Sequence, residues 1–108
     1  METEKILKAL GEPMRFKIFT CLLERKHCVR SLSKKLEISE SAISQHLKVM
    51  READMIYGEK YGYHAHYLPE QDALDFLAEL FADMREQALL LDRDMTVCQC
   101  EFRKEAEE

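Results

Sequence analysis

The sequence is poor in glycine and proline, with three and two among 108 residues, and it contains no low-complexity tract. This composition argues against long linkers or disorder before the last few residues. No apolar run approaches the roughly 20 residues that span a membrane, and the N-terminus lacks the basic start and apolar stretch of a signal peptide. We therefore expect one cytoplasmic domain without a membrane segment, in which the four cysteines are reduced thiols.

The formal net charge of −5 conceals an uneven distribution of charge along the chain. Residues 1–51 hold 11 Lys and Arg against 6 Asp and Glu, whereas residues 52–108 hold 5 against 15. A basic first half indicates a surface for an anionic partner, with the acidic half directed elsewhere. A charge run is also common on an ordinary solvated surface, so the asymmetry alone does not identify the partner.

Apolar residues recur at helical spacing through the first half of the chain and predict four helices, at residues 3–10, 13–25, 29–36 and 40–53. Gly11 ends the first helix, and Pro13 suits the start of the second because its missing N–H has no helical partner there. Ser39 is placed to cap the fourth helix. A short helix, a tight turn and a second helix with small polar residues at its start is the plan of a helix-turn-helix.

The spacing then changes from helical to alternating. Met55–Tyr57 and Tyr63–Leu68 predict two strands of a β-hairpin, joined by a turn over Gly58–Gly62. A long final helix begins near Pro69 and carries an apolar stripe that continues through Leu91. The expected fold is therefore mainly α with a β-hairpin wing, a winged helix-turn-helix.

We expect two parts: a DNA-binding and dimerisation domain in residues 1–94, and an acidic, cysteine-containing tail in residues 95–108. A domain of this size buries only about 60–65% of its unfolded surface, so it gains stability from oligomerisation.

Three stretches carry a resemblance to the ArsR-type (ArsR/SmtB) family of winged-helix regulators. They read LKALGEPMRFKIFTCLLE, SLSKKLEISESAISQHLKVMREADMI and YGEKYGYHAHYLPE, and together they cover about residues 6–70. The Ser-x-x-Ser-x-His-Leu core of the second stretch is the most specific part. The resemblance implies a transcriptional repressor that binds an inverted-repeat operator as a homodimer through its first and last helices. Asp54 stands where the family usually has Gly, and Asp tolerates the left-handed conformation of a helix end.

An α-helix fits the major groove of DNA, and short side chains at its start can reach base edges. We expect Gln45 to offer its amide to adenine, and Ala42 to touch a thymine methyl group. Lysines contribute affinity through the backbone phosphates rather than sequence choice. The expected DNA-contacting residues are Ser41, Ala42, Ser44, Gln45, His46 and Lys48 on the recognition helix, Lys34 and Lys35 on the preceding helix, and Lys60 and Tyr61 on the wing.

Two alternatives remain open for these residues. The polar face of the fourth helix can be merely solvated, and His46 can stabilise the turn locally instead of reading bases. The winged-helix fold also serves as a protein–protein interaction module, because a fold does not oblige one function. An enzyme is not expected, because no nucleophile, base and orienting group can be picked out together.

Members of the resembling family commonly release DNA when a metal ion, a metalloid or an oxidant reacts with a site on a helix. One common site, a Cys-Val-Cys segment, reads Cys28-Val29-Arg30 in this sequence, and a guanidinium is no metal ligand. A second common site uses Asp and His on the last helix, but residues 70–94 contain no histidine. Neither standard site is therefore intact.

Cys98 and Cys100 remain, two thiols separated by one residue. Such a pair can bind one soft ion, As(III), Cd(II), Pb(II) or Zn(II), with Cys28 as third ligand from the same or the other subunit. We therefore expect no required cofactor, and an inducer ion bound through Cys98, Cys100 and Cys28. The open alternatives are an oxidant that links these thiols, and cysteines that are incidental to an effector-independent regulator.

Overall fold

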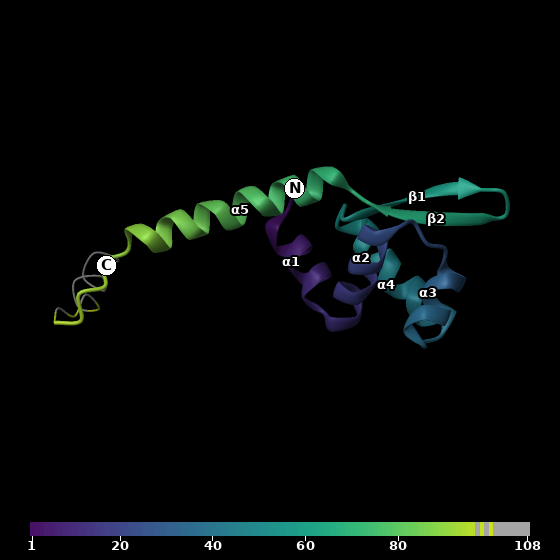
Figure 1. The fold of residues 1–108 in the computed structure, drawn as a ribbon, viewed down its shortest axis with the longest axis horizontal. Helices are drawn as coiled ribbons and strands as arrows, with labels where there is room; N and C mark the ends of the chain where they lie inside the picture. Colours follow the sequence, from purple (N-terminus) through teal and green to yellow (C-terminus); the bar gives the residue numbers. More distant parts are fainter. Residues whose placement is uncertain (97, 99, 101–108) are drawn as a thin grey trace.

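The computed structural model describes residues 1–96, 98 and 100. Within these residues, five helices and one hairpin follow one another in the predicted order (Figure 1). They are α1 (Thr3–Gly11), α2 (Pro13–Glu24), α3 (Val29–Leu36), α4 (Glu40–Glu52), β1 (Ile56–Tyr61), β2 (His64–Pro69) and α5 (Gln71–Leu90). The mainly α winged helix-turn-helix expected from the sequence is confirmed.

The helix starts follow from local capping chemistry. Pro13 is the first residue of α2, and the Glu12 carboxylate accepts the backbone N–H of Arg15 at 2.9 Å. The hydroxyl of Ser39 accepts the backbone N–H of Ala42 at 3.1 Å, as predicted for the start of α4. Each cap satisfies a backbone donor that the first turn of a helix leaves without a partner.

A single apolar core joins α1 to α4, the start of β1 and the start of α5. On α1, α4 and α5 the buried residues are spaced three, four or seven apart, as an amphipathic helix requires. The largest fully buried side chains of the core are Ile6, Ile18, Leu32, Ile43, Leu47, Met50 and Met55. This core fixes α3 and α4 against each other and leaves their opposite faces to solvent.

The hairpin is longer than the sequence suggested, and its turn was misplaced. β1 pairs with β2 in antiparallel register as far as Tyr61 opposite His64, so the turn lies at Gly62 and Tyr63 rather than over residues 58–62. Gly62 has φ of +67°, a left-handed conformation that favours glycine. Gly58 belongs to the strand, where a β-carbon would meet the Tyr67 ring at 3.2 Å.

A short third pairing, which the sequence did not predict, ties the helix-turn-helix to the wing. His27 forms an isolated antiparallel bridge with Tyr67 of β2. The N–H of Tyr67 donates to the carbonyl of His27 at 2.8 Å, and the reciprocal bond measures 3.4 Å. The residue that precedes Cys28 and α3 is thereby fixed to the hairpin.

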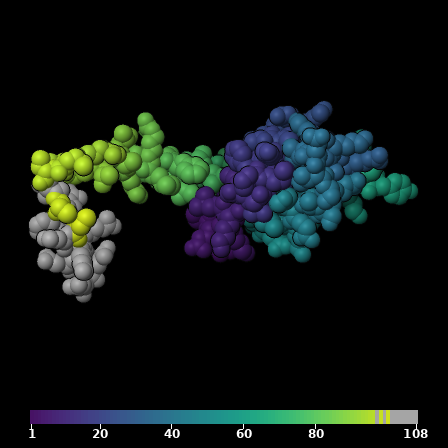
Figure 2. Space-filling view, turned by 90° about the horizontal axis from the view of Figure 1, so that it is seen from below, coloured from purple at the N-terminus to yellow at the C-terminus, as the bar shows by residue number. Residues whose placement is uncertain are grey.

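Helix α5 leaves the body of the protein soon after it begins. Ala73 and Leu77 are buried, whereas every residue from 81 to 90 is exposed. Figures 1 and 2 show the far half of α5 extending beyond the other helices, and the molecule measures 63 × 24 × 24 Å. The helix ends at Leu90, so the prediction that it includes Leu91 was one residue too long. Among the described residues, no helix is both long and apolar enough to cross a bilayer.

Candidate nucleic-acid interface and thiol groups

The exposed face of α4 carries four of the residues predicted to contact DNA. Ser41, Ser44, Gln45 and Lys48 are all exposed, and their spacing of three, four and seven residues places them on one side of the helix. The opposite side of α4 is anchored in the core by Ile43, Leu47 and Met50. The helix therefore presents a continuous polar stripe from its N-terminal end.

Ala42 and His46 are half-buried and lie beside this stripe rather than on it. His46 Nδ1 lies 3.5 Å from an Arg15 guanidinium nitrogen and 3.8 Å from a Glu12 carboxylate oxygen. Arg15 in turn donates to the carbonyl of Ala9 at 2.7 Å. His46 thus links α4 to the junction of α1 and α2, rather than to the turn before α4 that the sequence suggested as an alternative.

The Glu12 carboxylate at this junction has its pKa lowered below the ordinary value. The largest cause is the hydrogen bond from the backbone N–H of Arg15, and burial acts in the opposite direction. The charges of His46 and Arg15 lower it further. Glu12 is therefore held in its ionised form, which suits both the helix cap and the contact with His46.

The predicted phosphate-contacting lysines of α3 are both exposed. Lys35 forms an ion pair with Glu24 of α2 at 3.2 Å, which is exposed to solvent and so adds little stability. On the wing, Lys60 and Tyr61 are exposed, but Tyr61 stacks on the ring of His66 with centroids 5.3 Å apart. The turn itself presents Tyr63, which is fully exposed and which the sequence reasoning missed because it misplaced the turn.

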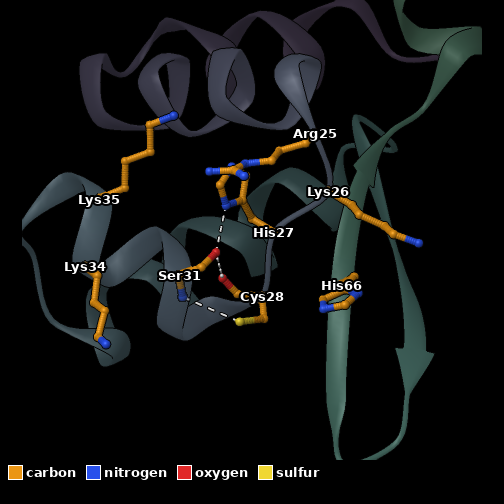
Figure 3. Close-up of a pocket in the computed structure, with 8 residues that line it drawn as sticks. All are labelled: Arg25, Lys26, His27, Cys28, Ser31, Lys34, Lys35 and His66. Carbon is orange, nitrogen blue, oxygen red and sulfur yellow. Dashed lines mark hydrogen bonds between the residues drawn. The ribbon is translucent and has the colours of Figure 1, made fainter.

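His27 is the buried polar residue of the site, with only 4% of its surface exposed. Its Nδ1 lies 2.7 Å from the hydroxyl of Ser31, which donates to the carbonyl of Cys28 at 3.3 Å (Figure 3). Burial lowers the pKa of His27, and the nearby charges of Lys35 and Arg25 lower it further. His27 is therefore neutral in the folded protein near neutral pH.

This lowered pKa predicts that the protein loses stability in mild acid. The neutral ring contributes stability that is present above the unfolded pKa of about 6.5 and is lost as pH falls through the folded pKa. The midpoint temperature of thermal unfolding should fall less between about pH 7.5 and about pH 5 in His27→Gln than in the wild type. His64→Gln, which changes an exposed histidine of the same hairpin, should show the same pH dependence of the unfolding temperature as the wild type. An equal pH dependence in all three proteins would contradict the role given to His27.

The four cysteines lie in different surroundings. Cys21 is buried in α2, as expected for a small core residue, and Cys28 is half-buried at the start of α3, where its sulfur accepts the N–H of Ser31 at 3.4 Å. Cys98 and Cys100 are exposed and follow α5 in the chain, and the far end of α5 lies away from α3 (Figure 1). Within the part of the chain that the structure describes, no three His, Cys, Asp or Glu side chains come together as a metal site. One chain alone therefore does not bring Cys28 to Cys98 and Cys100.

Comparison with known proteins places this geometry in a regulatory context. Residues 12–57 match the family described as bacterial regulatory protein, arsR family. The chain is similar to the HTH-type transcriptional repressor SmtB of Mycobacterium tuberculosis strain H37Rv, with 36% identity over 54% of this chain and 43% of that protein. It is also similar to the arsenical resistance operon repressor of Bacillus subtilis strain 168, with 33% identity over 70% of this chain and 74% of that protein.

The fold is likewise similar to a solved structure of a possible transcriptional regulator for arsenical resistance. The TM-score is 0.67 at 31% identity, covering 74% of this chain and 83% of that one. The chain thus spans most of this structure but less than half of the length of the SmtB repressor.

Proposed function

Because the chain belongs to the arsR family of bacterial regulatory proteins, we propose that it is a transcriptional repressor that binds operator DNA as a homodimer. The observation that carries the proposal is the exposed polar stripe of Ser41, Ser44, Gln45 and Lys48, held on a helix whose other side is core. The hairpin beside it supplies the wing.

In this proposal α4 enters the major groove with its N-terminal end against the bases. Gln45 can pair with adenine through both ends of its amide, and the two serines can donate to or accept from base edges. Lys48 and the α3 lysines contact phosphates and set affinity rather than sequence preference. Two copies related by a two-fold axis place their α4 helices in successive major grooves about 34 Å apart, which requires an inverted-repeat operator.

The far half of α5 supports the dimer. Leu77 is buried, whereas Phe81 and Met84, which follow it on the same side of α5 at helical spacing, are 52 and 54% exposed. A contiguous apolar surface of this kind on a projecting helix is unusual for a monomer and favours burial against a partner. A second copy of α5, packed alongside and related by two-fold symmetry, would bury these side chains.

We further propose that a thiophilic ion bound through Cys98 and Cys100 releases the DNA, with Cys28 of the other chain as the third ligand. Two copies could bring together thiols that one chain keeps apart. The side chains around Cys28 include Arg25, Lys26 and Arg30, which repel a divalent cation. Arsenite is an uncharged hydroxide near neutral pH, so As(III) is the ion that this position favours over Cd(II), Pb(II) and Zn(II).

The DNA-binding claim is tested by fluorescence anisotropy of the reduced protein on DNA from its own promoter. We expect tight binding that weakens steeply with salt. Gln45→Ala should lose about 1–3 kcal/mol on the operator because it removes a bidentate contact to a base, with little change on unrelated DNA. Lys48→Ala should instead weaken binding to all sequences and reduce the salt slope by about one.

Lys17→Ala is the matched control, because Lys17 is an exposed lysine of α2 away from the stripe. It should bind the operator like the wild type. Binding that is independent of salt and equal in all four proteins would overturn the proposal and favour a protein–protein interaction module.

A further inference from the structure

Glu40 is the first residue of α4, and its side chain is exposed. It precedes the exposed Ser44 by four residues, so both lie on the same edge of the helix. Arg51, about three turns further along this edge, places its guanidinium 6.0 Å from the centre of the Tyr67 ring of β2. The edge of α4 that carries Glu40 is therefore the one that faces the hairpin.

A recess of about 460 Å³ lies between the start of α3, the start of α4 and the tip of the hairpin. Glu40 lines it together with Arg30 of α3 and with Tyr63 and His64 of the hairpin. Tyr63 is fully exposed at the hairpin tip. Because α4 and the wing approach the same DNA in the proposed function, Glu40 lies on the surface that meets the operator.

A carboxylate on this surface is unfavourable unless a hydrogen-bond donor meets it. Among the described residues, no ion pair or hydrogen bond holds the Glu40 side chain, and Arg30 in the same recess does not pair with it. The DNA phosphates repel a negative charge. The donors that a carboxylate can meet in the major groove are the amino groups of cytosine and adenine.

The edges of the bases decide between these two donors. An ionised carboxylate accepts hydrogen bonds and cannot donate them. Cytosine presents only its amino donor in the major groove, whereas adenine places the N7 acceptor beside its amino group and guanine presents two acceptors. We propose that Glu40 accepts a hydrogen bond from the N4 amino group of a cytosine in each half-site, a role that rests on the proposed function of operator binding. The operator then has a position at which cytosine is favoured and guanine is opposed.

The alternative role of Glu40 is structural, because the helix dipole stabilises an acidic residue in the first turn. The two roles predict different effects of removing the carboxylate. If Glu40 only stabilises α4, its charge repels every DNA backbone, and its removal strengthens binding to all sequences equally. If Glu40 reads cytosine, its removal weakens binding to cytosine at one position and relieves the exclusion of guanine there.

The test selects bound sequences from a pool of duplexes with randomised inverted repeats, with the full-length reduced protein, and then measures affinities by fluorescence anisotropy. The wild type should select cytosine at one position of each half-site, and guanine there should weaken binding by about fivefold or more. Glu40→Ala should lose this preference. Glu40→Gln should instead select adenine, because an amide can pair with both N6 and N7 of that base. A new preference of this kind does not follow from a weakened helix.

Glu52→Gln is the matched control, because it removes the same charge from the last residue of α4, which lines a separate recess with Lys5 and Lys8 of α1. It should keep the cytosine preference. The proposal is overturned if Glu40→Ala selects the same sequences as the wild type, or if it strengthens binding to all duplexes equally. Operator binding itself stands after either result. A wild type that selects no sequence from the pool would instead remove the proposed function, and the role of Glu40 with it.

Discussion

Replacing Phe81 with Glu is expected to convert the protein to a monomer and to weaken operator binding by about a hundredfold or more. The side chain is 52% exposed on the distal half of α5, on the side that continues from the buried Leu77. A carboxylate at the centre of an apolar interface would be buried without a partner. A monomer binds each half-site separately. It therefore lacks the gain in affinity of about 10²- to 10⁴-fold that linking two binding modules provides. Sedimentation or gel filtration gives the mass, and anisotropy gives the affinity.

Ala82→Glu is the matched control, because it introduces the same charge at the next residue of α5, which faces away from Leu77. It should remain dimeric and bind nearly as the wild type does. A Phe81→Glu protein that stays dimeric would place the dimer contact elsewhere. A wild-type protein that is monomeric and still binds an inverted repeat tightly would contradict the proposed assembly.

Replacing Cys98 and Cys100 with Ser is expected to leave operator binding intact and to abolish its release by arsenite. Both thiols are exposed and lie far along the chain from α4, so their loss does not touch the DNA-contacting surface. In the wild type, arsenite should weaken operator binding by about 5- to 150-fold, the usual range of coupling between two sites. Cys28→Ser should lower the affinity for arsenite while it preserves DNA binding.

Cys21→Ala is the control, because Cys21 is a buried thiol of α2 and should not affect the response. The same titration separates a metalloid sensor from a redox switch. Release by peroxide that dithiothreitol reverses, without release by arsenite, would favour oxidation of the thiols. A double variant that still responds to arsenite like the wild type would show that the C-terminal pair is not the sensor.

The order of helices and hairpin was predictable because each helix has an apolar side in the core. Alternation predicted the two strands but misplaced the turn between them, because every residue of β1 after Ile56 is exposed and burial does not alternate along that strand. The bridge between His27 and Tyr67 was not predictable, since residues 40 positions apart in the sequence leave no local pattern when they pair.

The same limit applies to the candidate site. The spacing of residues predicted the exposed stripe of α4, because the apolar residues that face the core also define which residues lie on the opposite, exposed side. It could not show that His46 is engaged by Arg15, which lies 31 residues earlier. It also gave no sign that His27 is buried, because the neighbours of His27 in the sequence are Lys26 and Cys28 and carry no apolar pattern.

The projection of α5 has a mechanical consequence for a dimer built on it. From Leu77 to Leu90 the helix runs 13 residues, an arm of about 20 Å at 1.5 Å per residue. Each helix-turn-helix is then attached to the dimer contact through this arm. A tilt of about 6° where the two arms cross moves the other end of each arm by about 2 Å. The two α4 helices must match a major-groove repeat of about 34 Å. A small rotation where the arms cross is therefore enough to misalign the α4 helices with the grooves. A ligand need not touch the reading helices to dislodge them, provided that it turns the arms.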